Sequence, residues 1–282
     1  MRIFVTYSTP NYFKARNLAA RMAKLFGRFD KIVLYSPDDI DTDFKKNNSD
    51  ILKIERGAGL WLWKPYSIYK ALLEEAEDGD YVFYCDAASF FIRNCNYIIR
   101  TMYDNDIWVS ESNFIEEFYT KEDAFHILNC TDDKYRKTNQ IQAQFFCARK
   151  SSSSTAFVKE WLDNACNYSL ICPENINPGF ENVDCFVEHR FDQSVLSLLI
   201  KKYGIKPHLS PLERTCTNKH KSSLRKEMFR KEREYPCCII LQHSPNIDVK
   251  FSLIAILKVF TPKIIVEFMR RFKHRSNKEY TG

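Results

Sequence analysis

The sequence lacks several features that would place it in a specialised class. Its ten cysteines are scattered over 282 residues without a Cys-x-x-Cys pair, so we expect reduced, buried thiols rather than a disulfide scaffold. No uncharged apolar run reaches the ~20 residues that span a bilayer, and the first apolar run is too short for a signal peptide. We therefore expect a cytoplasmic protein. There is also no internal repeat.

The charge is unevenly distributed along the chain. The net charge is +6, and the basic residues are concentrated after about residue 200, which indicates an anionic partner. Residues 213–234 alone contain eight Lys or Arg residues, but no nucleic-acid-binding module accompanies them, so a nucleic acid is not the expected partner. With 45% hydrophobic residues, the chain has enough apolar material for a sizeable core.

Apolar runs that end at polar, turn-forming clusters alternate with helical patterns. This alternation predicts an α/β fold with a mainly parallel, twisted sheet flanked by helices. The first expected helix carries Ala15, Leu18, Ala19, Met22 and Leu25 on one buried face. The expected strands are 2–7, 32–35, 81–85, 143–148 and 237–242, and the later helices are 66–77, 157–165 and 194–202.

Asp86 directly follows the apolar strand 81–85. Ligands of open α/β sheets gather outside the carboxyl ends of the strands, so Asp86 stands where chemistry is expected. A carboxylate there could hold Mg²⁺ or Mn²⁺, which favour oxygen ligands. The alternative is that Asp86 only caps the next turn.

The segment from Tyr84 to Ile92 resembles the strand and DxD loop of GT-A glycosyltransferases, especially the glycogenin-like and bacterial lipooligosaccharide galactosyltransferase group. The resemblance places Asp86 on the first DxD carboxylate and Ala88 on the second, which is normally the direct metal ligand. It implies a divalent cation, Mn²⁺ or Mg²⁺, with another residue completing the site, or else Lys and Arg side chains in place of the metal. His243 resembles the C-terminal metal ligand of these enzymes; the alternative is an ordinary surface histidine.

Asp192 and Gln193 begin a segment, Asp192–Leu196, that is similar to the DQxxL motif of the same enzymes. The resemblance implies that Asp192 is a sugar-binding or catalytic carboxylate and that Gln193 lies near the anomeric carbon. Asp192 could also be the N-cap of the helix that follows it.

Donor-binding residues are expected in four further segments. Residues 57–65 resemble a loop of surface-polysaccharide glycosyltransferases, in which Lys64 would pair with a phosphate and Trp63 would stack on the donor or belong to the core. The resemblance sets Gln142 against the sugar hydroxyls; the alternative is that Gln142 and Gln144 line a solvated strand edge. The places where this fold binds the nucleotide base and ribose are occupied by Thr6, Tyr7 and Ser8 after the first strand and by Asp38 or Asp39 after the second.

The resemblance implies an enzyme that transfers a hexose from a nucleotide-sugar donor, expected to be UDP-linked, to a saccharide or lipid-linked glycan acceptor in surface-polysaccharide synthesis. The DQ motif favours retention of configuration. The alternative is a catalytically degenerate sugar-nucleotide fold that acts as a membrane-associated assembly or binding protein.

We expect a GT-A domain over residues 1–248 and a basic amphipathic segment over residues 249–282. This segment alternates apolar residues with Lys and Arg, a pattern that favours peripheral binding to the anionic cytoplasmic face of a membrane. The alternative is that it packs on the catalytic domain as a final helix.

Overall fold

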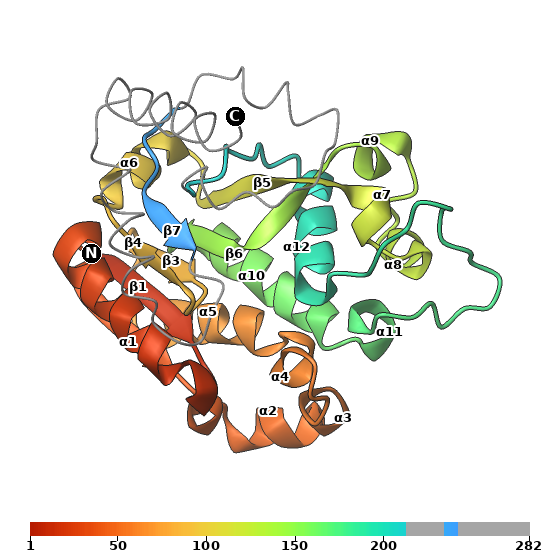
Figure 1. Cartoon of the computed structure of the whole chain (residues 1–282), viewed down its shortest axis with the longest axis horizontal. Helices are drawn as coiled ribbons and strands as arrows, with labels where there is room; N and C mark the ends of the chain where they lie inside the picture. The colour runs from red at the N-terminus through yellow and green to blue at the C-terminus, as the bar shows by residue number, and fades with distance from the viewer. Residues whose placement is uncertain (213–233, 242–282) are drawn as a thin grey trace, which may run out of the picture.

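The computed structural model describes residues 1–212 and 234–241. The expected ligand His243 and the segment 249–282 lie outside these ranges. The described chain is built on a five-stranded sheet with the order β2-β1-β3-β6-β5 (Figure 1). Its strands are β1 (Arg2–Tyr7), β2 (Lys31–Tyr35), β3 (Tyr81–Cys85), β5 (Ile107–Ile115) and β6 (Asn139–Arg149).

One strand of this sheet is reversed. β1 is parallel to both β2 and β3, whereas β6 is antiparallel to β3 and to β5. The prediction of a mainly parallel sheet is therefore confirmed, with β6 as the exception. Because Cys85 pairs with Phe145, the residues that precede Phe145 extend past the carboxyl end of β3.

The two faces of the sheet bury two cores, and β1 alternates between them. Ile3, Val5 and Tyr7 face the first core and Phe4 faces the second, as the period of two in a strand requires. The first core is covered by α5 (Trp63–Glu74), α10 (Ser152–Ala165) and α12 (Phe191–Lys202). The second is covered by α1 (Phe13–Met22), α6 (Asn96–Ile99) and a two-stranded sheet of β4 (Ser89–Phe91) and β7 (Ile239–Leu241).

Short helical segments connect these elements. They are η1 (Pro10–Tyr12), η2 (Ala23–Gly27), η3 (Pro37–Asp39), α2 (Thr42–Asn47), α3 (Ser49–Leu52), α4 (Gly57–Leu60), η4 (Arg100–Met102), α7 (Glu116–Tyr119), α8 (Glu122–Ile127), α9 (Asp133–Arg136) and α11 (Tyr168–Ile171). Among residues 1–212 and 234–241, no helix has the length and apolar character needed to cross a bilayer.

Two expectations about the first half of the chain are wrong. Leu25 is 62% exposed, because α1 ends at Met22 and the π-helical turn η2 follows it, which breaks the 3.6-residue period. α5 begins at Trp63 rather than at residue 66, so Lys64 lies in the first turn of a helix.

Candidate functional site

Three charged side chains meet at the carboxyl edge of the sheet. Asp86 follows β3, Lys64 lies in the first turn of α5, and Asp192 lies in the first turn of α12. The Nζ atom of Lys64 is 3.2 Å from Oδ1 of Asp86 and 3.6 Å from Oδ2 of Asp192. The structure thus brings together three residues that the sequence analysis assigned to separate motifs, 22 to 128 positions apart.

The cluster is largely withdrawn from water. Asp192 and Lys64 are 3% and 4% exposed, and Oδ2 of Asp192 has no hydrogen-bond partner within residues 1–212 and 234–241. Burial raises the pKa of Asp192 to about 7, although Lys64 opposes this shift. Burial lowers the pKa of Lys64, but Asp192 and Asp86 outweigh it and the pKa lies above its usual value. Lys64 is therefore charged, and Asp192 can exchange a proton near neutral pH.

Asp86 is the most accessible member of the cluster, with a side chain 29% exposed. Its Oδ1 receives both the Lys64 contact and a 2.7 Å hydrogen bond from the Tyr84 hydroxyl. Burial raises the pKa of Tyr84 well above its usual value, so Tyr84 remains a donor. Both contacts are on Oδ1, so Oδ2 of Asp86 is open to a ligand as far as the described residues are concerned.

Asp86 and Asp192 could instead have served only as caps of a turn and of a helix. The N-cap of α12 is Arg190, without a side-chain cap, so Asp192 does not cap this helix. The turn after β3 closes through the backbone, because the Ser89 N–H donates to the main-chain oxygen of Asp86. Neither carboxylate is therefore used up by local capping.

The two segments that carry Lys64 and Asp192 contain strained backbone. Leu60, Trp61 and Phe191 have φ angles of +52°, +60° and +50°, which non-glycine residues rarely adopt and which concentrate at functional sites. The Trp61 and Phe191 rings pack with centroids 5.1 Å apart. Gly57 accommodates this contact, because a Cβ there would lie 2.2 Å from Cε3 of Trp61.

Tyr7 and Trp63, both expected at the donor, contact each other. Their rings stack with centroids 4.1 Å apart and an interplanar angle of 14°, and both residues are buried. The Trp63 indole N–H donates to the Gly57 carbonyl at 2.8 Å. Trp63 thus joins β1 to the start of α5 and holds the turn next to Lys64.

Thr6 and Ser8 differ from Tyr7 in having unused polar atoms. Both residues are buried, and their hydroxyl oxygens have no hydrogen-bond partner among the residues that the structure describes. Buried polar groups normally find a partner, so these hydroxyls are open to a ligand at the end of β1. Asp38, in η3 after β2, is exposed.

Gln193 is tied to β6. Its Oε1 accepts the Ala143 N–H at 3.2 Å, and its Nε2 donates to Oε1 of Gln140 at 2.7 Å. Gln142, the residue expected against the sugar, instead accepts from the hydroxyl of Ser110 at 3.0 Å. Its role in sugar binding stays a prediction.

Sequence reasoning missed Gln140 and Tyr84. Tyr84 could have been found, because in a strand it lies on the same face as a residue two positions later. Gln140 carries no such local signal, because its partners are distant in sequence.

The described residues can contribute to a metal site but do not complete one. They contain no group of three or more His, Cys, Asp or Glu side chains that could hold a metal ion. Mg²⁺ is commonly held by one or two carboxylates together with substrate phosphates and water. Asp86, with Oδ2 open, fits such a site.

Comparisons with known proteins gave structural matches alone. No family of known proteins matches the sequence, and no curated protein is similar to it. Mouse xyloside xylosyltransferase 1 is 11% identical over 88% of this chain and 100% of its own, with a TM-score of 0.46. An active-site mutant of LgtC is 12% identical over 93% of this chain and 97% of its own, also with a TM-score of 0.46. The bifunctional glycosyltransferase WbbM is 11% identical over 85% of this chain and 45% of its own, with a TM-score of 0.46.

Proposed function

We propose that this chain is a glycosyltransferase that transfers a hexose from a nucleotide-sugar donor to a glycan acceptor. One observation carries the proposal: a buried lysine joins two carboxylates, Asp86 and Asp192, outside the carboxyl ends of the strands. Open α/β sheets bind ligands at this edge. The unused hydroxyls of Thr6 and Ser8 lie at the end of β1, on the same edge.

Asp192 is the proposed catalytic carboxylate. Transfer to an acceptor hydroxyl requires a group that stabilises the developing charge at the anomeric carbon or accepts the hydroxyl proton. With its pKa near 7, Asp192 suits proton transfer at neutral pH. The neighbouring Gln193 would contribute hydrogen bonds to the reacting groups.

Lys64 is proposed to hold the two carboxylates in place. Its Nζ already contacts both of them, so a donor phosphate would have to compete with two anions for it. When both carboxylates are ionised, the three groups together carry one negative charge. The departing diphosphate therefore needs positive charge from another source.

A divalent cation is the source we propose. Mn²⁺ or Mg²⁺ bound at Asp86 would supply that charge as a Lewis acid. His243, which lies outside the described residues, is the expected additional ligand. Tyr84 and Lys64 would keep Oδ1 of Asp86 oriented away from the ligand position.

The finer assignments follow from the motifs. We propose a UDP-linked hexose donor, a saccharide or lipid-linked acceptor in surface-polysaccharide synthesis, and retention of configuration. The anomeric configuration of the new glycosidic bond, read by NMR and compared with that of the donor, tests the last point. A product of inverted configuration would refute retention but would still agree with the proposed transferase activity.

A screen of nucleotide sugars with Mn²⁺ tests the function itself. We expect one donor to bind by calorimetry and to be hydrolysed slowly without acceptor, and Asp86→Ala to abolish hydrolysis. The exposed Asp43→Ala serves as the matched control. If no donor binds, the proposal fails. Donor binding without hydrolysis or transfer would favour the degenerate assembly protein instead.

We also propose that residues 249–282 hold the enzyme on the cytoplasmic face of an anionic membrane. Each Lys or Arg near such a surface contributes about 1 kcal/mol. The intact chain should co-sediment with phosphatidylserine vesicles, less so as salt rises, whereas a chain ending at Asp248 should remain in solution. Equal sedimentation of the two chains would refute membrane binding through this segment.

A further inference from the structure

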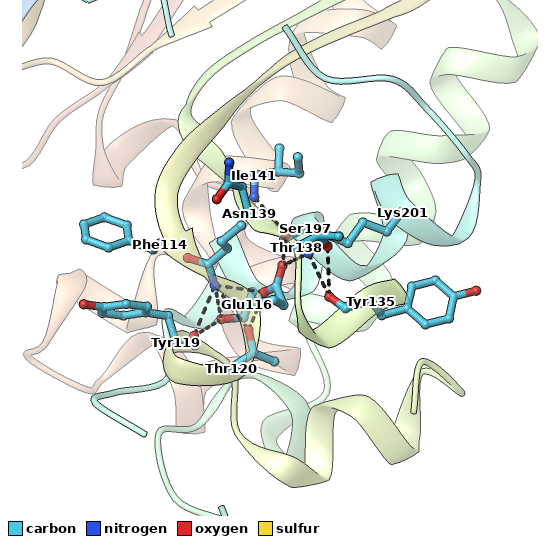
Figure 2. Close-up of polar contacts among 12 residues, drawn as sticks. Phe114, Glu116, Tyr119, Thr120, Tyr135, Thr138, Asn139, Ile141, Ser197 and Lys201 are labelled. Atoms are coloured by element: carbon cyan, nitrogen blue, oxygen red, sulfur yellow. Dashed lines mark hydrogen bonds and ion pairs between the residues drawn. The ribbon is translucent and has the colours of Figure 1, made fainter. Parts of the chain in front are cut away.

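Glu116 is a fully buried carboxylate beside the proposed site. It is the first residue of α7 and is 0% exposed. One of its oxygens, Oε1, accepts from the Thr120 hydroxyl at 2.6 Å and from Nε2 of Gln140 at 3.0 Å. The other, Oε2, accepts from the Ser197 hydroxyl and from Nζ of Lys201, the latter at 2.6 Å. Figure 2 shows Glu116 between Thr120 on one side and Ser197 and Lys201 on the other.

Glu116 is one of the acceptors that determine which way the amide of Gln140 faces. Nε2 of Gln140 is directed at Oε1 of Glu116 and, at 3.1 Å, at the Tyr119 carbonyl. An ionised carboxylate and a carbonyl can only accept hydrogen bonds. The amide nitrogen of Gln140 must therefore face them, and its oxygen must face the opposite way, toward Gln193.

The orientation of Gln140 in turn restricts Gln193. A backbone N–H can only donate, so the Ala143 N–H requires the oxygen of Gln193. Oε1 of Gln140 requires a donor, which is Nε2 of Gln193. The two requirements agree, and they leave one N–H of Gln193 without a partner among the described residues, on a side chain that is partly exposed.

We propose that Glu116 is a positioning residue of the transfer reaction. Its charge orients the amide of Gln140, and Gln140 orients Gln193 so that it presents an N–H, rather than its carbonyl oxygen, to the bound donor. The kinetic part of this inference rests on the proposed function. Gln193 then acts as a hydrogen-bond donor to the reacting groups.

The two oxygens of Glu116 allow a matched control. We call the hydrogen-bonded chain from Glu116 through Gln140 to Gln193 the relay. Gln140→Met interrupts the relay on the Oε1 side of Glu116. Lys201→Met removes a charge on the Oε2 side, which does not contact Gln140 or Gln193. Glu116→Gln tests the charge itself. In this variant Lys201 still requires an acceptor, so the oxygen of the new amide takes the position of Oε2. Its NH₂ group then takes the position of Oε1 and faces Nε2 of Gln140. Two donors cannot pair, so the native orientation of the Gln140 amide is disfavoured.

NMR of the glutamine side-chain amides tests the relay without requiring the protein to be enzymatically active. The chain has five glutamines, and Gln140, Gln142, Gln144 and Gln193 are four of them, so glutamine-selective ¹⁵N labelling gives a sparse spectrum. We expect the Gln193 amide pair to shift and become mobile in Gln140→Met and in Glu116→Gln, but to stay in place in folded Lys201→Met. An unchanged Gln193 pair in the first two variants would overturn the proposal, as would equal changes in all three.

Kinetics test whether the relay acts through Gln193. We expect Gln140→Met to lower kcat by about tenfold to a hundredfold, as for small misplacements of catalytic groups, with the donor KM nearly unchanged. In a Gln193→Met background the same change should have little further effect. If the losses in kcat from Gln140→Met and Gln193→Met simply add, the relay is refuted. If the wild-type chain neither transfers nor hydrolyses any donor, the proposed function fails, and the NMR result still decides whether Glu116 orients Gln193.

Discussion

Removing the positive charge of Lys64 should destabilise the protein in a pH-dependent way. Lys64→Met keeps most of the apolar stem but leaves Asp86 and Asp192 without their shared cation. Asp192 is 3% exposed, so water cannot replace the lost contact. Breaking a buried ion pair on one side typically costs about 3–5 kcal/mol.

The pH dependence follows from the proton on Asp192. Its pKa is about 7 in the folded protein and 3.8 ordinarily, so between these values the native state binds a proton that the unfolded state does not. Stability supplied by this proton is complete below pH 3.8 and is lost as pH rises toward 7, at up to about 1.4 kcal/mol per pH unit. Without Lys64 the folded pKa rises further, and the loss continues above pH 7.

Urea unfolding at pH 5.5 and pH 8.5 measures both effects. We expect Lys64→Met to lose about 3–5 kcal/mol at pH 8.5, and at least ~1.4 kcal/mol less at pH 5.5, the equivalent of one pKa unit. The double variant Lys64→Met with Asp192→Asn should recover most of the loss at pH 8.5. An equal loss at both pH values, or no recovery in the double variant, would refute the reasoning.

Three further predictions concern the same site. Asp192→Asn should lower kcat by about 10²–10⁴-fold, and a rise in KM alone would make Asp192 a binding residue. Gly57→Ala should lower the melting temperature more than Gly79→Ala, because both have positive φ but a Cβ meets Trp61 only at the first; equal losses would contradict the steric argument. Chelation with EDTA should reduce transfer and Mn²⁺ should restore it, whereas full activity after exhaustive chelation would show that no metal is needed.

The fold could be predicted where apolar runs are long and end sharply. The runs 2–7, 32–35 and 81–85 are strands β1, β2 and β3 within a residue, because they are continuous and bounded by turn residues. β5 was missed, since the segment Ser110–Asn113 within it is polar. The start of α5 was placed too late because Trp63-Lys64-Pro65 reads as a loop, although proline is well tolerated in a helix's first turn.

The site could be predicted only in part. Asp86 and Asp192 were found from strand-end position and motif, and both lie in the cluster. Their connection through Lys64 could not be found, because an ion pair between residues 128 positions apart depends on tertiary packing. Glu116 had no signal at all, since it follows the strand that was missed.

The reversal of β6 makes the site possible. A parallel strand beside β3 would begin at the opposite edge of the sheet, far from Asp86. Because β6 runs antiparallel, residues 139–144 lie past the end of β3, where the Asp86 N–H donates to the Gln144 carbonyl. The same stretch supplies Gln140 and the Ala143 N–H to Gln193. Hydrophobic periodicity identifies a strand but not its direction, so the residues that hold Gln193 could be placed next to Asp86 only once the topology was known.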